Sequence, residues 1–454
     1  MTTESLLVDH PARLERLAEV FLRRKIVVAT DPDGQLVLIR PDSIVIDVGT
    51  GGGGGFDRAV ESIVKRYGDG ARERIGKPGI GGIVRFELPD SADPIDIAGE
   101  ERWSADPTQE AIAALRDDAL VVESNHVLLG SQVVRGSPVG TAAHFVGGMM
   151  FTADIDDGTP AGPVLRSTSE PALPPAFLRQ PLELPHARPQ VLVLDTGLRT
   201  SDGKGAAVEH AALTCARLHS PWLQDPQPGH VDDEDEFDDD GSGTLDFEAG
   251  HGTFITGIIQ QICPDAEVHV AGVLSSFGDG DVATVVAAFE TALTQAGPFD
   301  IVIMSLGGYM TDDDGTLFGA GLERLLGDGL GIAAAGNQST SRPYFPAALP
   351  SIVGVGALGE GDKAWFTNFG GWVDACAPGI DVVSTFFTGD SKAPKEPPFT
   401  GWARWSGSSF SAPKVAGAVA QEMYLTQSTA RESWRRLSHH WRYRFPDLGI
   451  VFNL

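Results

Sequence analysis

The chain has 454 residues, of which 62 are acidic and 34 are basic, so its formal net charge is −28. This excess of acid argues against nucleic acids and anionic membranes as partners, because both are bound through basic surfaces. The length predicts two or more domains, and the 3 widely spaced cysteines (Cys215, Cys263 and Cys376) are expected as small buried residues rather than a disulfide framework or a zinc site.

The first 130 residues predict a small α+β domain. Glu4 comes early and no basic segment followed by an apolar run is present, so we expect no signal peptide and a cytoplasmic location. No window reaches the roughly 18 consecutive apolar residues of a membrane-spanning helix. Periodicity predicts, in order, helix 7–24, strands 35–39 and 43–48, helix 56–67, strand 82–88, helix 106–117 and strand 119–129. From residue 43 onward, with room for a further strand near 72–80, this order indicates a ferredoxin-like domain.

A glycine run at 51–55 lies between a predicted strand and a predicted helix. It formally satisfies the G-x-G-x-x-G spacing of dinucleotide-binding loops. A run of glycines satisfies any glycine spacing, however, so a flexible connecting loop is the preferred interpretation.

Residues 131–186 are rich in proline and glycine and predict an extended linker. Residues 187–430 then alternate between apolar strand-like runs and helical segments, which predicts a parallel sheet with helices on both faces. The strand-like runs are 189–194, 268–273, 301–305, 331–335 and 352–355, with a helix over 282–295. Residues 431–454 are interpreted as a basic, aromatic C-terminal tail.

An acidic segment at 232–241 raises the question of calcium binding. Counted from Gly241, the first ligand position of a calcium loop is Glu236 and the last is Phe247, where glutamate is required. A solvated acidic loop is therefore preferred, with a bias toward basic substrates as a further expectation.

Three short segments carry residues suited to nucleophilic catalysis. Asp195 ends a buried strand, where open α/β sheets place their sites, and His251 opens a helix rich in small residues. Ser409 stands in a small-residue turn before another helix, and Pro413 suits the first turn of that helix. Each residue alone has a structural explanation, such as a helix cap. Together, in the order Asp, His, Ser, they form one of the chain orders of convergent serine triads.

These segments resemble the subtilisin-like serine proteases (subtilases). Asp195-Thr196-Gly197 is similar to the aspartate motif of the family, and His251-Gly252-Thr253 with Gly257 is similar to the histidine motif. Residues 407–413 are similar to the serine motif, with Ser408 where threonine is usual and Phe410 where methionine is usual. The aspartate motif departs downstream, where Glu209-His210 is the nearest approach to the usual His-Pro pair.

The resemblance implies further roles. Ala333 to Asn337 resembles the strand that delivers an oxyanion-hole asparagine, Asn337, and Ser305-Leu306-Gly307 resembles the edge strand that pairs with substrate. Residues 108–127 resemble the closing helix and strand of an inhibitory prodomain. The family implies a protein or peptide substrate and no required cofactor, with calcium as an optional ligand.

The sequence thus predicts a serine endopeptidase with an α/β catalytic domain, preceded by a smaller α+β domain that regulates it. The alternative is a catalytically silent subtilase fold that serves as a binding scaffold. The presence of Asp195, His251, Asn337 and Ser409 favours the enzyme.

Overall fold

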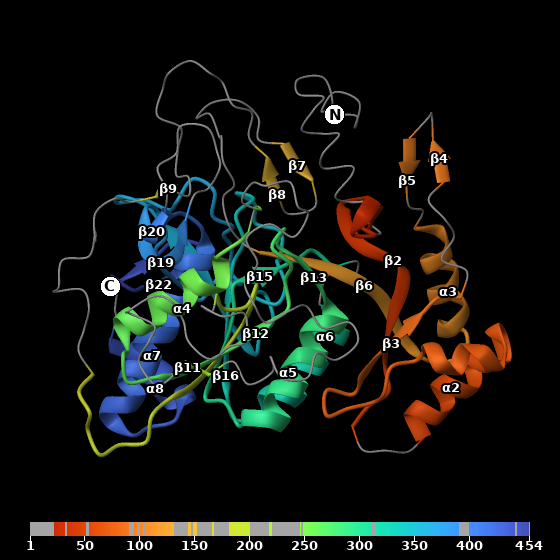
Figure 1. Ribbon diagram of the computed structural model, residues 1–454, viewed down its shortest axis with the longest axis horizontal. Coiled ribbons are helices and arrows are strands. Elements are labelled where there is room, and N and C mark those ends of the chain that lie inside the picture. Colours follow the sequence, from red (N-terminus) through yellow and green to blue (C-terminus); the bar gives the residue numbers. More distant parts are fainter. Residues whose placement is uncertain are drawn as a thin grey trace.

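A computed structural model describes two packed units, a small N-terminal α+β unit and a larger α/β unit (Figure 1). The described residues are 22–31, 34–50, 54–89, 95–97, 100–102, 105–130, 144–146, 149–151, 166–167, 181–199, 218–219, 246, 248–310, 315–389, 399–440 and 443–453. The predicted helix over 7–24, apart from its last residues, lies outside this part of the chain, as do the acidic segment 232–241 and Cys215.

The larger unit is built on a nine-stranded sheet whose strands are parallel except at the β21 edge. β10 (Gln190–Asp195) pairs with β12 (Glu267–Gly272) on one side and with β14 (Ile301–Met304) on the other. Almost every residue of these strands is buried, as apolar runs in a parallel sheet predict. The other strands are β11 (Leu218–His219), β16 (Leu330–Ala334), β17 (Ile352–Leu358), β18 (Ala375–Pro378), β21 (Arg444–Phe445) and β22 (Gly449–Val451).

Helices cover both faces of this sheet, which confirms the predicted fold class (Figure 1). On one face α4 (His251–Ile262), α7 (Ala412–Thr426) and α8 (Ala430–His440) share one apolar core with the strands. On the other face α5 (Val282–Ala296) and α6 (Thr316–Leu326) share a second core. No helix within the described ranges is long and apolar enough to cross a bilayer.

The segment interpreted as a C-terminal tail is part of the larger unit. β22 pairs with β18 in the main sheet, and Ile450 and Phe452 are buried in the core on the α7 face. Trp434 of α8 stacks on Phe452 with ring centroids 6.0 Å apart. The boundary placed at residue 430 is therefore wrong. Arginines and histidines interrupt the apolar residues of this segment, so the sequence does not indicate that these apolar residues belong to the core.

Short strands also interrupt the segment predicted as a linker. β7 (His144–Val146) pairs with β8 (Met149–Phe151), and β9 (Arg166–Ser167) joins the hairpin of β19 (Val382–Gly389) and β20 (Phe399–Trp405). This hairpin lies on α4, where the hydroxyls of Ser384 and Thr385 donate to helix carbonyls at 2.7 and 2.8 Å. It thereby holds the start of α4 in place.

The N-terminal unit packs two helices, α2 (Gly54–Tyr67) and α3 (Asp106–Arg116), on an antiparallel sheet. The two strands predicted over 35–39 and 43–48 are one long strand, β2 (Leu36–Asp47), with an irregular register around Pro41, which has no N–H for the ladder. A 3₁₀-helix, η2 (Asp69–Arg74), occupies the start of the region where a further strand was expected, so that expectation is wrong. The remaining strands are β1 (Val27–Thr30), β3 (Ile83–Glu87), β4 (Ile95–Ile97), β5 (Glu100–Arg102) and β6 (Val121–Gly130).

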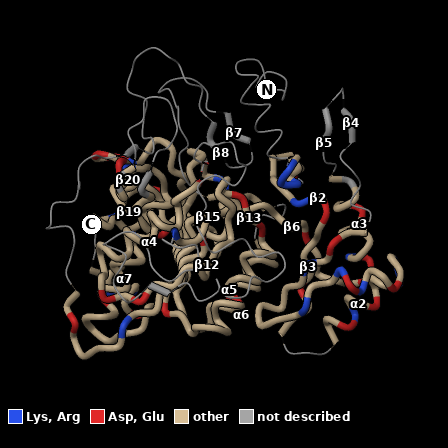
Figure 2. Tube along the Cα trace, viewed as in Figure 1, with Lys and Arg blue, Asp and Glu red and all other residues tan. Residues whose placement is uncertain are grey.

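β6 joins the two units. Its first half pairs with β2, and its second half leaves the N-terminal sheet and pairs with β13 (Asp279–Asp281) and β15 (Leu306–Gly307) of the larger unit (Figure 1). Figure 2 shows that basic residues of the first described turn lie close to the acidic residues of β13. Through β6, strands of both units therefore belong to one six-stranded sheet.

Two of the three cysteines lie in the described chain, and both are buried in apolar clusters, as expected. Burial raises the pKa of the Cys376 thiol to about 12, so this thiol is not poised to react. Both cysteines act as small core residues.

Candidate active site

Asp195 ends β10 at the carboxyl edge of the sheet, as the sequence predicts. Its side chain is fully buried. The Oδ1 atom accepts hydrogen bonds from the Thr196 backbone N–H at 2.8 Å and from Nδ1 of His251 at 2.7 Å. A carboxylate held in this way orients the imidazole and fixes its tautomer.

His251 is the first residue of α4, and small residues let the helix approach β10. The Gly252 N–H donates to Thr196 Oγ1 at 2.9 Å, and a side chain at Gly252 would strike the Gly197 carbonyl. The imidazole is fully buried, with its ring centroid 5.6 Å from that of Trp405 and 5.4 Å from that of Phe410. The histidine is thus enclosed by aromatic rings on one side and by Asp195 on the other.

Ser409 lies in the 3₁₀ turn η4 (Ser408–Phe410), directly before α7, and Pro413 falls in the first turn of α7 as expected. The Ser409 Oγ donates to the Ser305 carbonyl at 3.2 Å, and the Ser305 Oγ donates to the Ser409 carbonyl at 2.9 Å. Ser305 immediately precedes β15. The serine turn is therefore anchored to the strand that pairs with β6.

Asn337 follows β16, and a hydrogen bond from the serine turn orients its side chain. The Ser408 N–H donates to Asn337 Oδ1 at 2.9 Å, and the Ser408 hydroxyl accepts from the Gly336 N–H at 3.1 Å. Ser408 thus ties the serine turn to the turn of Gly336 and Asn337 through both its backbone and its side chain. The Asn337 Nδ2 group is buried and donates to no acceptor within the described part of the chain. A buried amide donor left in this state is suited to receive a developing negative charge.

The segment predicted to pair with substrate, Ser305-Leu306-Gly307, already pairs with a strand. Leu306 lies opposite Gly130, and Gly307 lies opposite Leu129. On the other side of β6, the Gly130 N–H donates to the Gly278 carbonyl at 2.9 Å. Position 307 requires glycine, because a side chain there would strike the Tyr344 ring and the Phe345 carbonyl.

Several residues of the site escaped sequence reasoning. Glu248 places Oε2 3.6 Å from His251 Nδ1, Thr196 Oγ1 accepts from the Gly252 N–H, and the ring centroid of Trp405 lies 5.6 Å from that of His251. The sequence positions of Glu248 and Thr196 give a partial indication that they belong to the site, because Glu248 lies three residues before His251 and Thr196 follows Asp195 directly. No comparable signal marks Trp405, which comes from a hairpin that the sequence did not predict.

The imidazole bonded to buried Asp195 lies next to the serine turn, since its ring centroid is 5.4 Å from that of Phe410, which follows Ser409 directly. The same turn holds the buried amide of Asn337. Such groups can perform nucleophilic acyl transfer. Among the residues that the structure describes, no group of three His, Cys, Asp or Glu side chains is placed to hold a metal ion. All of the predicted site residues (Asp195, His251, Ser409, Asn337 and Ser305 to Gly307) lie at this end of the sheet.

Comparison with known proteins supplies the family. Residues 124–440 match the family model described as Peptidase_S8, Subtilase family. A cuticle-degrading serine protease of Orbilia oligospora is 30% identical over 248 residues, which cover 53% of this chain and 50% of that protein. Subtilisin NAT of Bacillus subtilis subsp. natto is 29% identical over 187 residues, covering 38% of this chain and 45% of that protein.

The chain thus spans about half the length of these curated relatives. The solved structure of a cold adapted subtilisin-like serine proteinase is similar with a TM-score of 0.43 and 22% identity, covering 58% of this chain and 87% of that one. The family model, which spans more than half of the residues, decides the assignment: the chain belongs to the subtilase family.

Proposed function

We propose that this protein is a serine endopeptidase in which Ser409 is the nucleophile, His251 the general base and Asp195 the group that orients the imidazole. The observation that carries the proposal is the fully buried hydrogen bond of 2.7 Å between His251 Nδ1 and Asp195 Oδ1, beside the serine turn. With Nδ1 protonated toward the carboxylate, Nε2 is the basic nitrogen. This tautomer is the one that accepts a proton from serine.

The proposed reaction proceeds in two halves. Ser409 Oγ attacks the scissile carbonyl and passes its proton to His251, which then gives it to the leaving amine. The acyl-enzyme is hydrolysed by water through the same proton transfers. The oxyanion is received by Asn337 Nδ2 and the Ser409 N–H, which is supported by the buried and unpartnered state of that amide group in the described chain.

Peptides are the proposed substrate class, bound as an added strand. The pairing of β6 with β13 and β15 supports this, because it is the pairing that an extended substrate would use. Backbone hydrogen bonds would supply affinity on both sides of the cleft, and alternate side chains would supply specificity.

A fluorophosphonate probe tests the assignment on the full chain. We expect labelling at Ser409, loss of labelling and of peptide hydrolysis in Ser409→Ala, and an unchanged thermal melting curve. Ser411→Ala is the matched control, since its hydroxyl is also buried but donates to the Ala377 carbonyl. If neither the wild type nor Leu128→Asp, the variant described below that should expel the second half of β6, labels or hydrolyses any peptide while folded, the protein would be a silent scaffold, and the proposal would be wrong.

We further propose that the N-terminal unit regulates the enzyme by covering its cleft. Leu128, fully buried, packs with Leu306 and Leu274 in the core of the larger unit, so β6 fills the cleft with side chains as well as backbone. Tethering raises the effective concentration of this strand to the order of mM, so little intrinsic affinity is needed.

Leu128→Asp tests the regulation, because burying an uncompensated carboxylate costs several kcal/mol and should expel the second half of β6. We expect the hydrolysis rate of the full chain to rise. Val121→Asp is the control, because Val121 is 54% exposed at the other end of the same strand. Equal rates in the wild type and both variants would contradict regulation by β6 and leave the peptidase assignment intact.

A further inference from the structure

β13 presents two carboxylates to the strand in the cleft. Asp279 lies opposite Leu129 and Asp281 lies opposite Val127, and both aspartates are almost fully buried. Alternate residues of a strand point to the same side, and directly opposed residues of an antiparallel pair have Cβ atoms about 4.5–5.5 Å apart. The side chains at 127 and 129 therefore share one side of the cleft with the two carboxylates.

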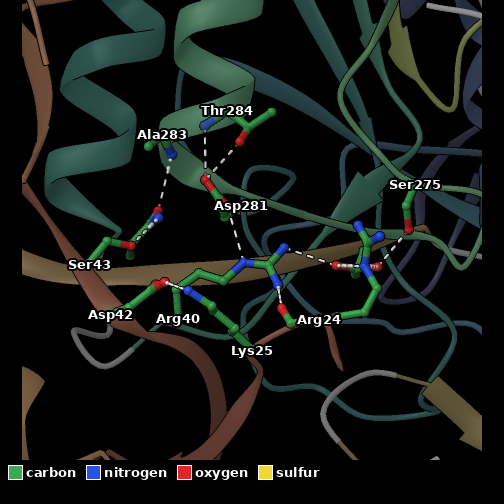
Figure 3. A network of polar contacts seen from close by, with 11 residues as sticks. Arg24, Lys25, Arg40, Asp42, Ser43, Ser275, Asp281, Ala283 and Thr284 are labelled. Carbon is green, nitrogen blue, oxygen red and sulfur yellow. Dashed lines mark hydrogen bonds and ion pairs between the residues drawn. The ribbon is translucent and has the colours of Figure 1, made fainter. Parts of the chain in front are cut away.

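Guanidinium groups from the N-terminal unit now lie on these carboxylates (Figure 3). Arg24 Nε is 2.7 Å from Asp279 Oδ1, and Arg40 places Nη2 2.9 Å from Asp279 and Nε 3.2 Å from Asp281. Burial raises the pKa of Asp279, but Arg40, Arg24 and the Ser275 hydroxyl outweigh it and hold that pKa below its usual range. The site is thus built for two negative charges with positive partners.

Removal of the N-terminal unit would leave the two aspartates with different hydrogen bonds. Asp281 keeps its hydrogen bonds with the start of α5, since it accepts from the Thr284 N–H at 2.9 Å and from the Thr284 hydroxyl at 3.0 Å. Asp279 keeps the Ser275 hydroxyl at 2.6 Å and loses both arginines. A buried carboxylate without a cation is unfavourable, so Asp279 has the stronger demand for a new positive partner.

We propose that Asp279, with Asp281 beside it, is a specificity subsite that selects peptides carrying arginine or lysine at the position now held by Leu129. The inference rests on the proposed peptidase function. Arg24 and Arg40 occupy this subsite in the resting chain as a substrate side chain would. An arginine at that position starts on the strand directly opposite Asp279 and has the length to reach the carboxylate.

The test uses the full chain in a Leu128→Asp, Arg24→Met, Arg40→Met background, which expels the second half of β6 and removes both arginines from Asp279. Two fluorogenic peptides copy residues 127–130 with leucine at 128, and carry either arginine or glutamine in place of Leu129. We expect kcat/KM to favour the arginine peptide by about tenfold or more, the range of a hydrogen bond to a charged group. Asp279→Asn should remove this preference, so that the ratio of the two kcat/KM values falls to about twofold or less.

Two further variants keep the result interpretable. Asp279→Glu retains the charge and should retain the preference, which separates a lost charge from a misfolded cleft. Asp47→Asn is the matched control, since Asp47 forms an ion pair of 2.8 Å with Arg324 between the same two units but away from β13, and it should leave the preference unchanged. Equal hydrolysis of both peptides would overturn the inference while the peptidase stands. Failure to hydrolyse either peptide, together with no probe labelling at Ser409, would instead refute the proposed function.

Discussion

Arg40→Met should loosen the N-terminal unit from β13 far more than Arg324→Met does. Arg40 is only 8% exposed and contacts Asp279 at 2.9 Å and Asp281 at 3.2 Å, and its Nη1 donates to the Arg24 carbonyl (Figure 3). Methionine preserves most of the aliphatic volume. The substitution therefore removes the charge and the hydrogen bonds and leaves two buried carboxylates behind.

Removing one partner of a buried ion pair costs about 3–5 kcal/mol. Here both carboxylates retain other donors, since Asp279 keeps Arg24 at 2.7 Å and Asp281 keeps the Thr284 N–H at 2.9 Å. We therefore expect the lower end, about 3 kcal/mol. At about 1.4 kcal/mol per tenfold, this is a change of roughly 150-fold in the equilibrium that seats β6 in the cleft.

Amide hydrogen exchange of the second half of β6 in the full chain measures this equilibrium, because local opening sets the exchange rate. Arg324→Met is the control, because the side chains of Arg324 and Asp47 are 26% and 17% exposed. A salt bridge this accessible to solvent contributes about 1 kcal/mol or less. We expect faster exchange at residues 127–130 in Arg40→Met and little change in Arg324→Met. Exchange in Arg40→Met within threefold of the wild type would refute the idea that buried ion pairs hold the strand.

Three further predictions concern catalysis and pH. Asn337→Ala should lower kcat by a hundredfold or more, about 3 kcal/mol; this magnitude is carried over from subtilisin's own oxyanion-hole asparagine, and an unchanged kcat would exclude the role. Peptide hydrolysis should fall as pH drops through the histidine range near ~6.5, because His251 must be neutral to accept a proton, and a pH–rate profile flat to pH 4 would contradict a histidine base. The pKa values of Asp279 and Asp281 are lowered, because their ion pairs outweigh the effect of burial, so their stabilisation is complete above the ordinary aspartate pKa of about 4 and is lost as pH falls below it. Hydrogen exchange in β6 should accordingly accelerate between pH 4 and pH 3 beyond its intrinsic pH dependence, and Asp279→Asn should weaken that acceleration.

Much of the larger unit could be predicted because its signals are local. The apolar run at 189–194 becomes β10, and the small residues after His251 become the first turns of α4, within one residue of the expected bounds. The sequence predicts Asp195 at the carboxyl end of its strand, where open α/β sheets place their sites, and the resemblance to subtilases implies the role of Asn337. Their contacts with His251 and Ser408 agree with that expectation.

The errors have a common physical origin. The predicted strands 35–39 and 43–48 flank Pro41, yet β2 runs through this proline, and the register shift against β6 absorbs it. Residues 431–454 are predicted as a tail because of their basic and aromatic residues, although β22 within them needs only a short apolar stretch to join the sheet. In both places, tertiary pairing outweighed local preference.

The sequence by itself determined the order of the motifs, the parallel character of the central sheet and the residue types of the site, since each depends on short-range periodicity and on chemistry readable from single segments. Only the tertiary structure decided that β6 runs between β13 and β15, that Glu248 and Trp405 border His251, and that Arg24 and Arg40 meet the carboxylates of Asp279 and Asp281. Those ion pairs join residues more than two hundred positions apart. No local pattern specifies such partners, because the attraction between these charges acts only where tertiary packing brings them together, and it must offset the cost of desolvating them.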